Sequence, residues 1–350
     1  MNTESTADSF AAGKLNPPEI NLDELKLNGK VFRENMGASI IDIGDRIGLV
    51  EFHTKANSLT NEVCEILLFA SEKGAAHFDA LVIGNRGKHF SAGANLLLVL
   101  DAARNNKWTF LDQTIRMLQA TSMTLKYGPL PVVAAPFSNA LGGGCEICLH
   151  SARVVLANET YMGLVETSVG LIPAGGGTKE LGLRAQHSAV KQGDVHLLSA
   201  LQKVFEAITR AKVSRTGAEA KELFLAGTDI VVPNREGPIG IAKQVALELV
   251  HSGYRNSTPR TDLAMIGAKG IRIFKSQIDQ LLDSMAITEH DAVIALHVAT
   301  ILCGGDHPAG TATEQHFLNL EREAFLSLLG TQKTQERIEF LLKNNKPLRN

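Results

Sequence analysis

An apolar run that leads into three consecutive glycines constrains this chain more than any other feature. Residues 131–137 read Pro-Val-Val-Ala-Ala-Pro-Phe, and Gly142, Gly143 and Gly144 follow shortly after them. A short apolar run of this kind predicts a buried strand, and we expect residues 145–151 to form a helix after the glycines. The first N–H groups of a helix have no helical acceptor, so such a turn can hold a negative charge.

Strand and helix patterns alternate through the first half of the chain, which predicts an α/β fold with buried strands. We expect a hairpin over 39–52, further strands at 78–84, 131–137 and 153–157, and helices at 61–74, 96–125 with a break near 105–106, and from 179. After Arg184 the sequence predicts one strand at 228–232 among helices at 190–211, 216–226, 237–252, 262–283, 287–302 and 311–343.

Composition excludes several classes of function. The net charge is −2 and no basic tract stands out, so we expect no nucleic-acid partner. No apolar run is long enough to span a bilayer, and the N-terminus lacks the pattern of a signal peptide. Four cysteines among 350 residues favour a reducing, cytoplasmic setting. The eleven histidines form no HExxH motif and no tight cluster with cysteine, so we expect no metal site.

Three loops carry residues that can do chemistry: residues 90–94, residues 142–144 and residues 166–177. Two such loops can each aim one N–H at a common oxygen, which makes an oxyanion hole worth about 3–4 kcal/mol per donor. Glu146 and Glu166 each lie beside a glycine-rich segment, and two carboxylates over one substrate can divide the acid and base roles. Each motif alone would more often be a tight turn or an ordinary helix or surface acid, so the interpretation depends on all three together.

The order and spacing of these motifs resemble the signatures of the crotonase (enoyl-CoA hydratase/isomerase) superfamily. The matching segments are Phe-Ser-Ala-Gly-Ala-Asn at 90–95, Ala-Leu-Gly-Gly-Gly-Cys-Glu at 140–146, Gly-Leu-Val-Glu at 163–166 and Gly-Leu-Ile-Pro-Ala-Gly-Gly-Gly-Thr at 170–178. Residues 320–330 and 343–348 are similar to the family's C-terminal helices. The resemblance is nearest to the hydratase half of bacterial bifunctional 3-hydroxyacyl-CoA dehydrogenases of fatty-acid β-oxidation.

The resemblance implies a crotonase-like core, the ClpP/crotonase spiral of ββα units, with an extended C-terminal helical region. We divide the chain into a flexible lead-in with a short helix (1–35), an α/β core with the active site (36–185) and a helical region with trimerisation-type helices (186–350).

The resemblance also implies roles for single residues. The N–H groups of Ala94 and Gly143 would hold the thioester oxygen, and Glu146 and Glu166 would hold a water and move protons. Coenzyme A would be bound by Lys55, Ala56, Asn57, Ser91, Ala92 and Gly142, with Lys343 or Lys346 near its phosphate. Two positions depart from the family pattern: Asn95 stands where aspartate is commoner, and Ala174 where glycine is usual.

The resulting hypothesis is an enoyl-CoA hydratase that adds water syn across the C2=C3 bond of 2-trans-enoyl-CoA. The alternatives are a Δ3-Δ2 enoyl-CoA isomerase and a non-catalytic CoA-binding scaffold for a separate 3-hydroxyacyl-CoA dehydrogenase chain. Residues 175–177 lack the strand and acid that accompany a dinucleotide fingerprint, so we expect no NAD site and no cofactor. The resemblance favours a homotrimer or a dimer of trimers, with a separate dehydrogenase or thiolase subunit as a further partner.

Overall fold

The computed structural model describes residues 19–190, 195–234 and 237–350, so the predicted lead-in over 1–18 lies outside the described residues. The chain divides into two compact units. Unit 1 comprises Met1–Ala94, Ala120–Gly163 and Val213–Thr258, and unit 2 comprises Asn95–Gln119, Leu164–Lys212 and Pro259–Asn350. The units interleave along the sequence, whereas the predicted domains are contiguous, and those domain limits stay predictions.

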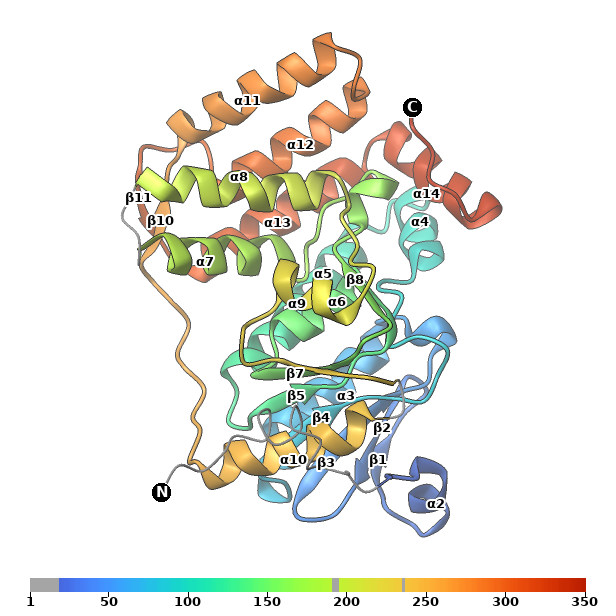
Figure 1. Cartoon of the computed structure of the whole chain (residues 1–350). Coiled ribbons are helices and arrows are strands. Elements are labelled where there is room, and N and C mark those ends of the chain that lie inside the picture. Colours follow the sequence, from blue (N-terminus) through green and yellow to red (C-terminus); the bar gives the residue numbers. More distant parts are fainter. Residues whose placement is uncertain (1–18, 191–194, 235–236) are drawn as a thin grey trace. The chain divides into compact units, whose positions relative to one another are not determined.

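Unit 1 is built on a seven-stranded sheet with the strand order β1-β2-β3-β4-β5-β7-β9 (Figure 1). Its strands are β1 (Val31–Glu34), β2 (Ala38–Asp42), β3 (Ile47–Phe52), β4 (Ala80–Ile83), β5 (Val132–Ala134), β7 (Arg153–Ala157) and β9 (Ile230–Val232). The first three strands pair antiparallel and the remaining pairs are parallel. The predicted hairpin is confirmed as β2–β3, while the mostly exposed edge strand β1 was missed because its Val-Phe-Arg-Glu sequence has no apolar alternation.

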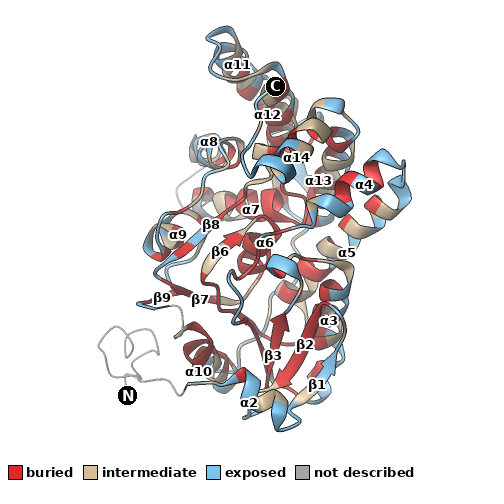
Figure 2. Ribbon diagram, turned by 90° about the vertical axis from the view of Figure 1, so that its right-hand side faces the viewer, coloured by how far each residue is buried: buried red, intermediate tan, exposed pale blue. Residues whose placement is uncertain are grey.

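Helices cover both faces of this sheet. Helix α10 (Pro238–His251) packs on β3, β4, β5 and β7, and α3 (Asn61–Glu72) packs on β2 and β3 from the other side (Figure 2). Ile47 and Leu49 of β3 belong to the core under α10, and Gly48 between them leaves room for Phe78 on the opposite face. This alternation is the period of two that a strand imposes.

Unit 1 contains further strands and helices beside this sheet. A second, parallel pair of strands is formed by β6 (Ser138–Leu141) and β8 (Thr160–Gly163). The other helical segments are α2 (Leu22–Leu27), η1 (Lys55–Asn57), η2 (Gly74–Ala76), α6 (Gly143–Leu149) and α9 (Gly217–Phe224).

Unit 2 is mainly helical. It contains α4 (Leu96–Arg104), η3 (Glu166–Val169), α7 (Gly177–Val190), α8 (Val195–Thr209), α11 (Ala268–Asp283), α12 (Glu289–Leu302), α13 (Glu314–Leu329) and α14 (Gln332–Asn344). The short strands β10 (Leu263–Met265) and β11 (Gly310–Ala312) pair antiparallel. Helix α5 (Trp108–Tyr127) begins in unit 2 and ends in unit 1.

Three predicted helix limits are wrong for identifiable reasons. The predicted helix 311–343 is two helices, because the Thr331 side chain accepts the Thr334 N–H and starts α14 anew. The predicted helix 262–283 starts only at Ala268, after β10 and after Gly267 with its φ of +64°. The helix expected at 145–151 begins two residues earlier, at Gly143. Within the described ranges, no helix is both long and apolar enough to cross a membrane.

Candidate active site

The turn from β6 into α6 is built around Gly142, whose φ of +55° and ψ of −124° suit glycine best. Its N–H donates to the Gly163 carbonyl at 2.9 Å, and its own carbonyl accepts the Glu146 N–H at 3.0 Å. Helix α6 therefore begins at Gly143, and the N–H of that residue belongs to the helix's first turn.

The two following glycines are required by close packing. A Cβ on Gly143 would lie 2.8 Å from Leu59 Cδ1, and a Cβ on Gly144 would lie 2.7 Å from Ser91 Cβ. Both distances are shorter than the van der Waals contact distance between two carbon atoms. The glycine triplet thus lets two other segments of unit 1 approach the start of α6.

The loop over residues 90–94 is one of these segments. Ser91 donates its N–H to Asn139 O and accepts the Leu141 N–H, each at 3.0 Å, which joins the loop to β6. A Cβ on Gly93 would lie 3.0 Å from Leu141 O and 3.3 Å from Gly143 N. The structure therefore brings the backbone that precedes Ala94 against the Gly142–Gly143 turn.

Ala94 itself is exposed and pairs with Leu59 in an isolated parallel bridge. The Gly93 carbonyl accepts the Leu59 N–H at 2.9 Å. Because the peptide group is planar and trans, this bond also sets the direction of the Ala94 N–H. The two predicted oxyanion donors, Ala94 and Gly143, lie on adjacent backbone segments of unit 1.

Glu146 lies in the first turn of α6 and is only 1% exposed. Its Oε2 lies 3.9 Å from the position that a Cβ on Gly143 would take, so the carboxylate lies close to Gly143. The Glu146 carbonyl accepts both the N–H of His150, at 3.1 Å, and its Nδ1, at 2.8 Å. His150 is fully buried, and its ring is hydrogen-bonded within α6.

The residues predicted to bind coenzyme A fall into two groups. Lys55, Ala56 and Ala92 are exposed, and the Ala92 N–H donates to Ala56 O at 3.1 Å. Asn57 and Ser91 are buried, and the Ser91 hydroxyl accepts the Gly93 N–H at 3.2 Å. Gly142 is buried as well. The coenzyme A contacts of this set stay predictions.

Glu166 is the first residue of η3 in unit 2, and its carbonyl accepts the Leu171 N–H at 3.0 Å. Since Glu146 belongs to unit 1, the pairing of the two carboxylates also stays a prediction. The Ala174 carbonyl is fixed by Gln119 Nε2 at 2.9 Å.

Two further predicted positions have partners within unit 2. The Asn95 side chain caps α4 by accepting the Leu98 N–H at 3.3 Å, a role that aspartate would also fill. Lys343 pairs with Glu339 at 2.6 Å, and Lys346 is exposed.

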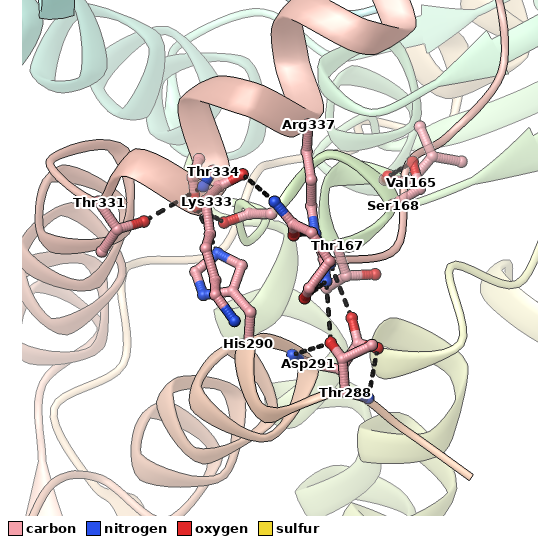
Figure 3. A network of polar contacts seen from close by, with 12 residues as sticks. Val165, Thr167, Ser168, Thr288, His290, Asp291, Thr331, Lys333, Thr334 and Arg337 are labelled. Carbon is pink, nitrogen blue, oxygen red and sulfur yellow. Dashed lines mark hydrogen bonds and ion pairs between the residues drawn. The ribbon is translucent and has the colours of Figure 1, made fainter. Parts of the chain in front are cut away.

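A polar network beside η3 was not predicted from the sequence (Figure 3). Thr334 of α14 donates its hydroxyl to Gly170 O at 2.8 Å, directly after η3. His290 Nε2 lies 2.8 Å from the same hydroxyl. Since the Thr334 proton is already used, Nε2 carries the proton and donates. Gly170 has a φ of +84°, and its missing Cβ makes room for Thr334.

Arg337 completes this network and is 1% exposed. Its guanidinium bonds Asp291 at 2.7 Å and Thr288 Oγ1 at 3.1 Å. Burial, followed by the charges of Arg337 and Lys333, lowers the pKa of His290 to about 4. The Thr288–Asp291 pair is a capping box, and its spacing in the sequence was the one signal that could have located this cluster.

Among the residues that the structure describes, no group of three or more His, Cys, Asp or Glu side chains is arranged to hold a metal ion.

Comparison with known proteins identifies the family. Residues 42–214 match the enoyl-CoA hydratase/isomerase family. The probable 3-hydroxyacyl-CoA dehydrogenase of Bacillus subtilis (strain 168) is 41% identical over 346 residues, which are 97% of this chain but 43% of that protein. The chain thus spans less than half the length of that relative. The mitochondrial methylglutaconyl-CoA hydratase of Homo sapiens is 28% identical over 270 residues, 76% of this chain and 69% of that protein.

Solved structures show the same fold. An enoyl-CoA hydratase from Rhodobacter sphaeroides 2.4.1 superposes with a TM-score of 0.60 at 16% identity, covering 90% of this chain and 92% of that one. An enoyl-CoA hydratase from Bacillus halodurans gives a TM-score of 0.58 at 17% identity, covering 86% and 98%. With the matching motifs at residues 90–95 and 140–146, these findings establish that the chain belongs to the crotonase (enoyl-CoA hydratase/isomerase) superfamily.

Proposed function

We propose that the chain is an enoyl-CoA hydratase, which adds water syn across the C2=C3 bond of 2-trans-enoyl-CoA to give 3-hydroxyacyl-CoA. One observation carries the proposal: the backbone before Ala94 packs on the Gly142–Gly143 turn, and the buried Glu146 carboxylate lies close to Gly143. This packing supports the proposal of two N–H donors and an acid around one position, as hydration of a thioester requires.

The two N–H groups act on the thioester oxygen. When water adds at C3, negative charge moves onto this oxygen and the thioester becomes an enolate. The Ala94 and Gly143 N–H groups stabilise that charge, and removal of one such donor costs about 3–4 kcal/mol. Both donors belong to the backbone, so their positions depend on packing at Gly93, Gly143 and Leu59 rather than on side-chain rotamers.

The two glutamates move the protons. In the proposed mechanism Glu146 and Glu166 hold the water; one removes its proton as the oxygen bonds to C3, and the other delivers a proton to C2. The product therefore gains one hydroxyl and one hydrogen. Two carboxylates that share a water act as a coupled pair, so the acid and base roles belong to the pair.

The product suggests a place in β-oxidation. The Bacillus subtilis relative is named a dehydrogenase of 3-hydroxyacyl-CoA, and this chain matches 43% of its length. We therefore propose that the 3-hydroxyacyl-CoA passes to a nicotinamide-dependent dehydrogenase activity outside residues 36–350, on the same or a separate chain. Assembly as a homotrimer or a dimer of trimers in the cytoplasm belongs to the same proposal.

The test is a hydration assay with crotonyl-CoA, in which saturation of the double bond removes the ultraviolet absorbance of the enoyl thioester. Glu146→Gln should lower kcat by about 10²- to 10⁴-fold, as expected for the loss of a general acid or base. Glu159→Gln is the matched control, since Glu159 is an exposed acid in the β7–β8 turn. Equal rates for wild type and Glu146→Gln would refute the assignment.

The isomerase alternative is separated by product mass. A hydratase converts 2-trans-enoyl-CoA to a product heavier by one water and leaves a 3-enoyl-CoA unchanged. An isomerase changes the position of the double bond and leaves the mass unchanged. Conversion of 3-enoyl-CoA without any hydration of 2-trans-enoyl-CoA would contradict the proposed function.

A further inference from the structure

Two buried asparagines join the loop that ends at Ala94 to the loop at η1. Asn57 and Asn85 are 5% and 3% exposed and come from separate segments of unit 1. Asn57 Nδ2 donates to Asn85 Oδ1 and to His89 O, each at 2.8 Å. Asn85 Nδ2 donates to Phe90 O at 3.0 Å. We call these two side chains the amide brace.

The amide brace uses its hydrogen-bonding capacity almost completely. Both Nδ2 hydrogens of Asn57 are engaged, and Asn85 Oδ1 accepts the Gly87 N–H at 3.1 Å as well as the bond from Asn57. A Cβ on Gly87 would lie only 2.7 Å from Asn57 Nδ2. Asn57 has a φ of +50°, a conformation that asparagine tolerates better than most residues. A buried amide pair with this many bonds fixes backbone geometry rather than contacting solvent.

The brace leads directly to the proposed oxyanion donor. It holds the carbonyls of His89 and Phe90, five and four residues before Ala94 respectively. The same η1 segment then accepts the Ala92 N–H at Ala56 O, and the Leu59 N–H donates to Gly93 O. The loop is therefore tied to residues 56–59 along its length, and the last of these bonds orients the peptide group that carries the Ala94 N–H.

We propose that Asn57 and Asn85 are positioning residues for the oxyanion hole, because they hold the backbone of residues 89–94 and thereby orient the Ala94 N–H. This inference rests on the proposed function. The Asn57 side chain accordingly supports the site from inside. A donor moved by a fraction of an ångström loses most of its effect on a developing charge, because catalysis by such groups requires a preset geometry.

Asparagine-to-aspartate changes remove the N–H donors of the brace and keep the size of the side chain. Asn57→Asp removes both bonds from Nδ2, and Asn85→Asp keeps the acceptor oxygen but loses the bond to Phe90 O. Asn35→Asp is the matched control. Asn35 also donates to a backbone carbonyl, Glu62 O at 2.8 Å, and accepts the N–H groups of Gly37 and Ala38. It makes the same kinds of bond at the β1–β2 turn, away from residues 89–94.

The readout is the carbonyl stretch of bound butyryl-CoA labelled with ¹³C at the thioester carbonyl, measured by infrared difference spectroscopy. This saturated thioester cannot be hydrated, so the band reports polarisation by the N–H donors alone. Wild type and Asn35→Asp should shift the band to lower frequency. Asn57→Asp and Asn85→Asp should lose most of the shift, and their kcat for crotonyl-CoA should fall by about 10- to 10³-fold with a smaller change in KM.

The outcomes separate the two proposals. A wild-type band that does not shift refutes the oxyanion hole itself, and with it both proposals. A shifted wild-type band that stays fully shifted in folded Asn57→Asp and Asn85→Asp refutes the amide brace alone. If the aspartate variants do not fold, Gly87→Ala replaces them, because its added methyl displaces Asn57 Nδ2 without removing a donor. That variant should lose part of the shift, and an unchanged band there counts against the brace.

Discussion

Replacing Thr334 by valine tests how the turn that carries Glu166 is held. The substitution keeps the shape of the side chain and removes only the hydroxyl, which is fully buried. Two groups lose their partner: Gly170 O, which accepts from Thr334 Oγ1 at 2.8 Å, and His290 Nε2–H, which donates to it at 2.8 Å. Figure 3 shows Thr334 and His290 together with Thr167 and Ser168 of η3.

The expected loss of stability follows from the number of buried polar groups that lose their hydrogen-bond partner. A buried polar group left without a partner costs about 1–3 kcal/mol, so two such groups give about 2–6 kcal/mol in the free energy of unfolding. Thr334→Ser retains the hydroxyl and loses one methyl group, which costs about 1 kcal/mol. Because Gly170 ends the turn that Glu166 begins, Thr334→Val should also lower kcat for crotonyl-CoA hydration more than Thr334→Ser does.

Urea unfolding measures the stability of wild type, Thr334→Val, Thr334→Ser and His290→Leu, together with the Thr334→Val/His290→Leu double variant. The double variant should be more stable than the sum of the single losses predicts, because the second change removes a group that the first left unsatisfied. A Thr334→Val protein within about 0.5 kcal/mol of wild type, below the cost of even one unpaired buried group, would refute the reasoning.

Three further predictions concern other parts of the structure. The pKa of His290 is lowered to about 4 in the folded protein, so on acidification the unfolded chain binds a proton at this side chain at a higher pH than the folded protein does. In urea unfolding, the free energy of unfolding of wild type should therefore exceed that of His290→Gln by the largest amount above pH 6.5, and this difference should shrink by about 2 kcal/mol on going to pH 4.5. Gly170→Ala should lose more stability than Gly29→Ala in thermal unfolding, since both have positive φ but an added Cβ meets Thr334 at Gly170 and nothing within 4 Å at Gly29. Burial raises the pKa of the Cys64 thiol to about 11 and that of Cys303 to about 12, so iodoacetamide at pH 8 should label them only in unfolded protein; rapid labelling of native protein would contradict their burial.

Much of unit 1 could be predicted because its strands are short apolar runs bounded by turn residues. Residues 153–157 form the predicted strand of unit 1, and in unit 2 the predicted break near 105–106 separates α4 from α5. The glycine turn could be found because Gly142 requires a positive φ and its two successors require space. Local sequence carries these requirements directly.

The hydrogen bonds that hold the loops of the site could not be predicted from local sequence. The Asn57–Asn85 bond joins residues 28 positions apart, and the Thr334–Gly170 bond joins residues 164 positions apart. Isolated asparagines and threonines occur throughout the chain, and nothing local distinguishes those that are buried and bonded. The division into interleaved units has the same origin, since each unit is assembled from three separate segments.

The most direct measurement of the central claim is the rate of crotonyl-CoA hydration by wild type and by the Glu146→Gln/Glu166→Gln double variant, with Glu159→Gln as the control. The account predicts that wild type and Glu159→Gln hydrate crotonyl-CoA at equal rates, and that the double variant is slower by at least about 10²-fold while still binding butyryl-CoA with a shifted carbonyl band. A wild-type protein that hydrates crotonyl-CoA no faster than the double variant would contradict it.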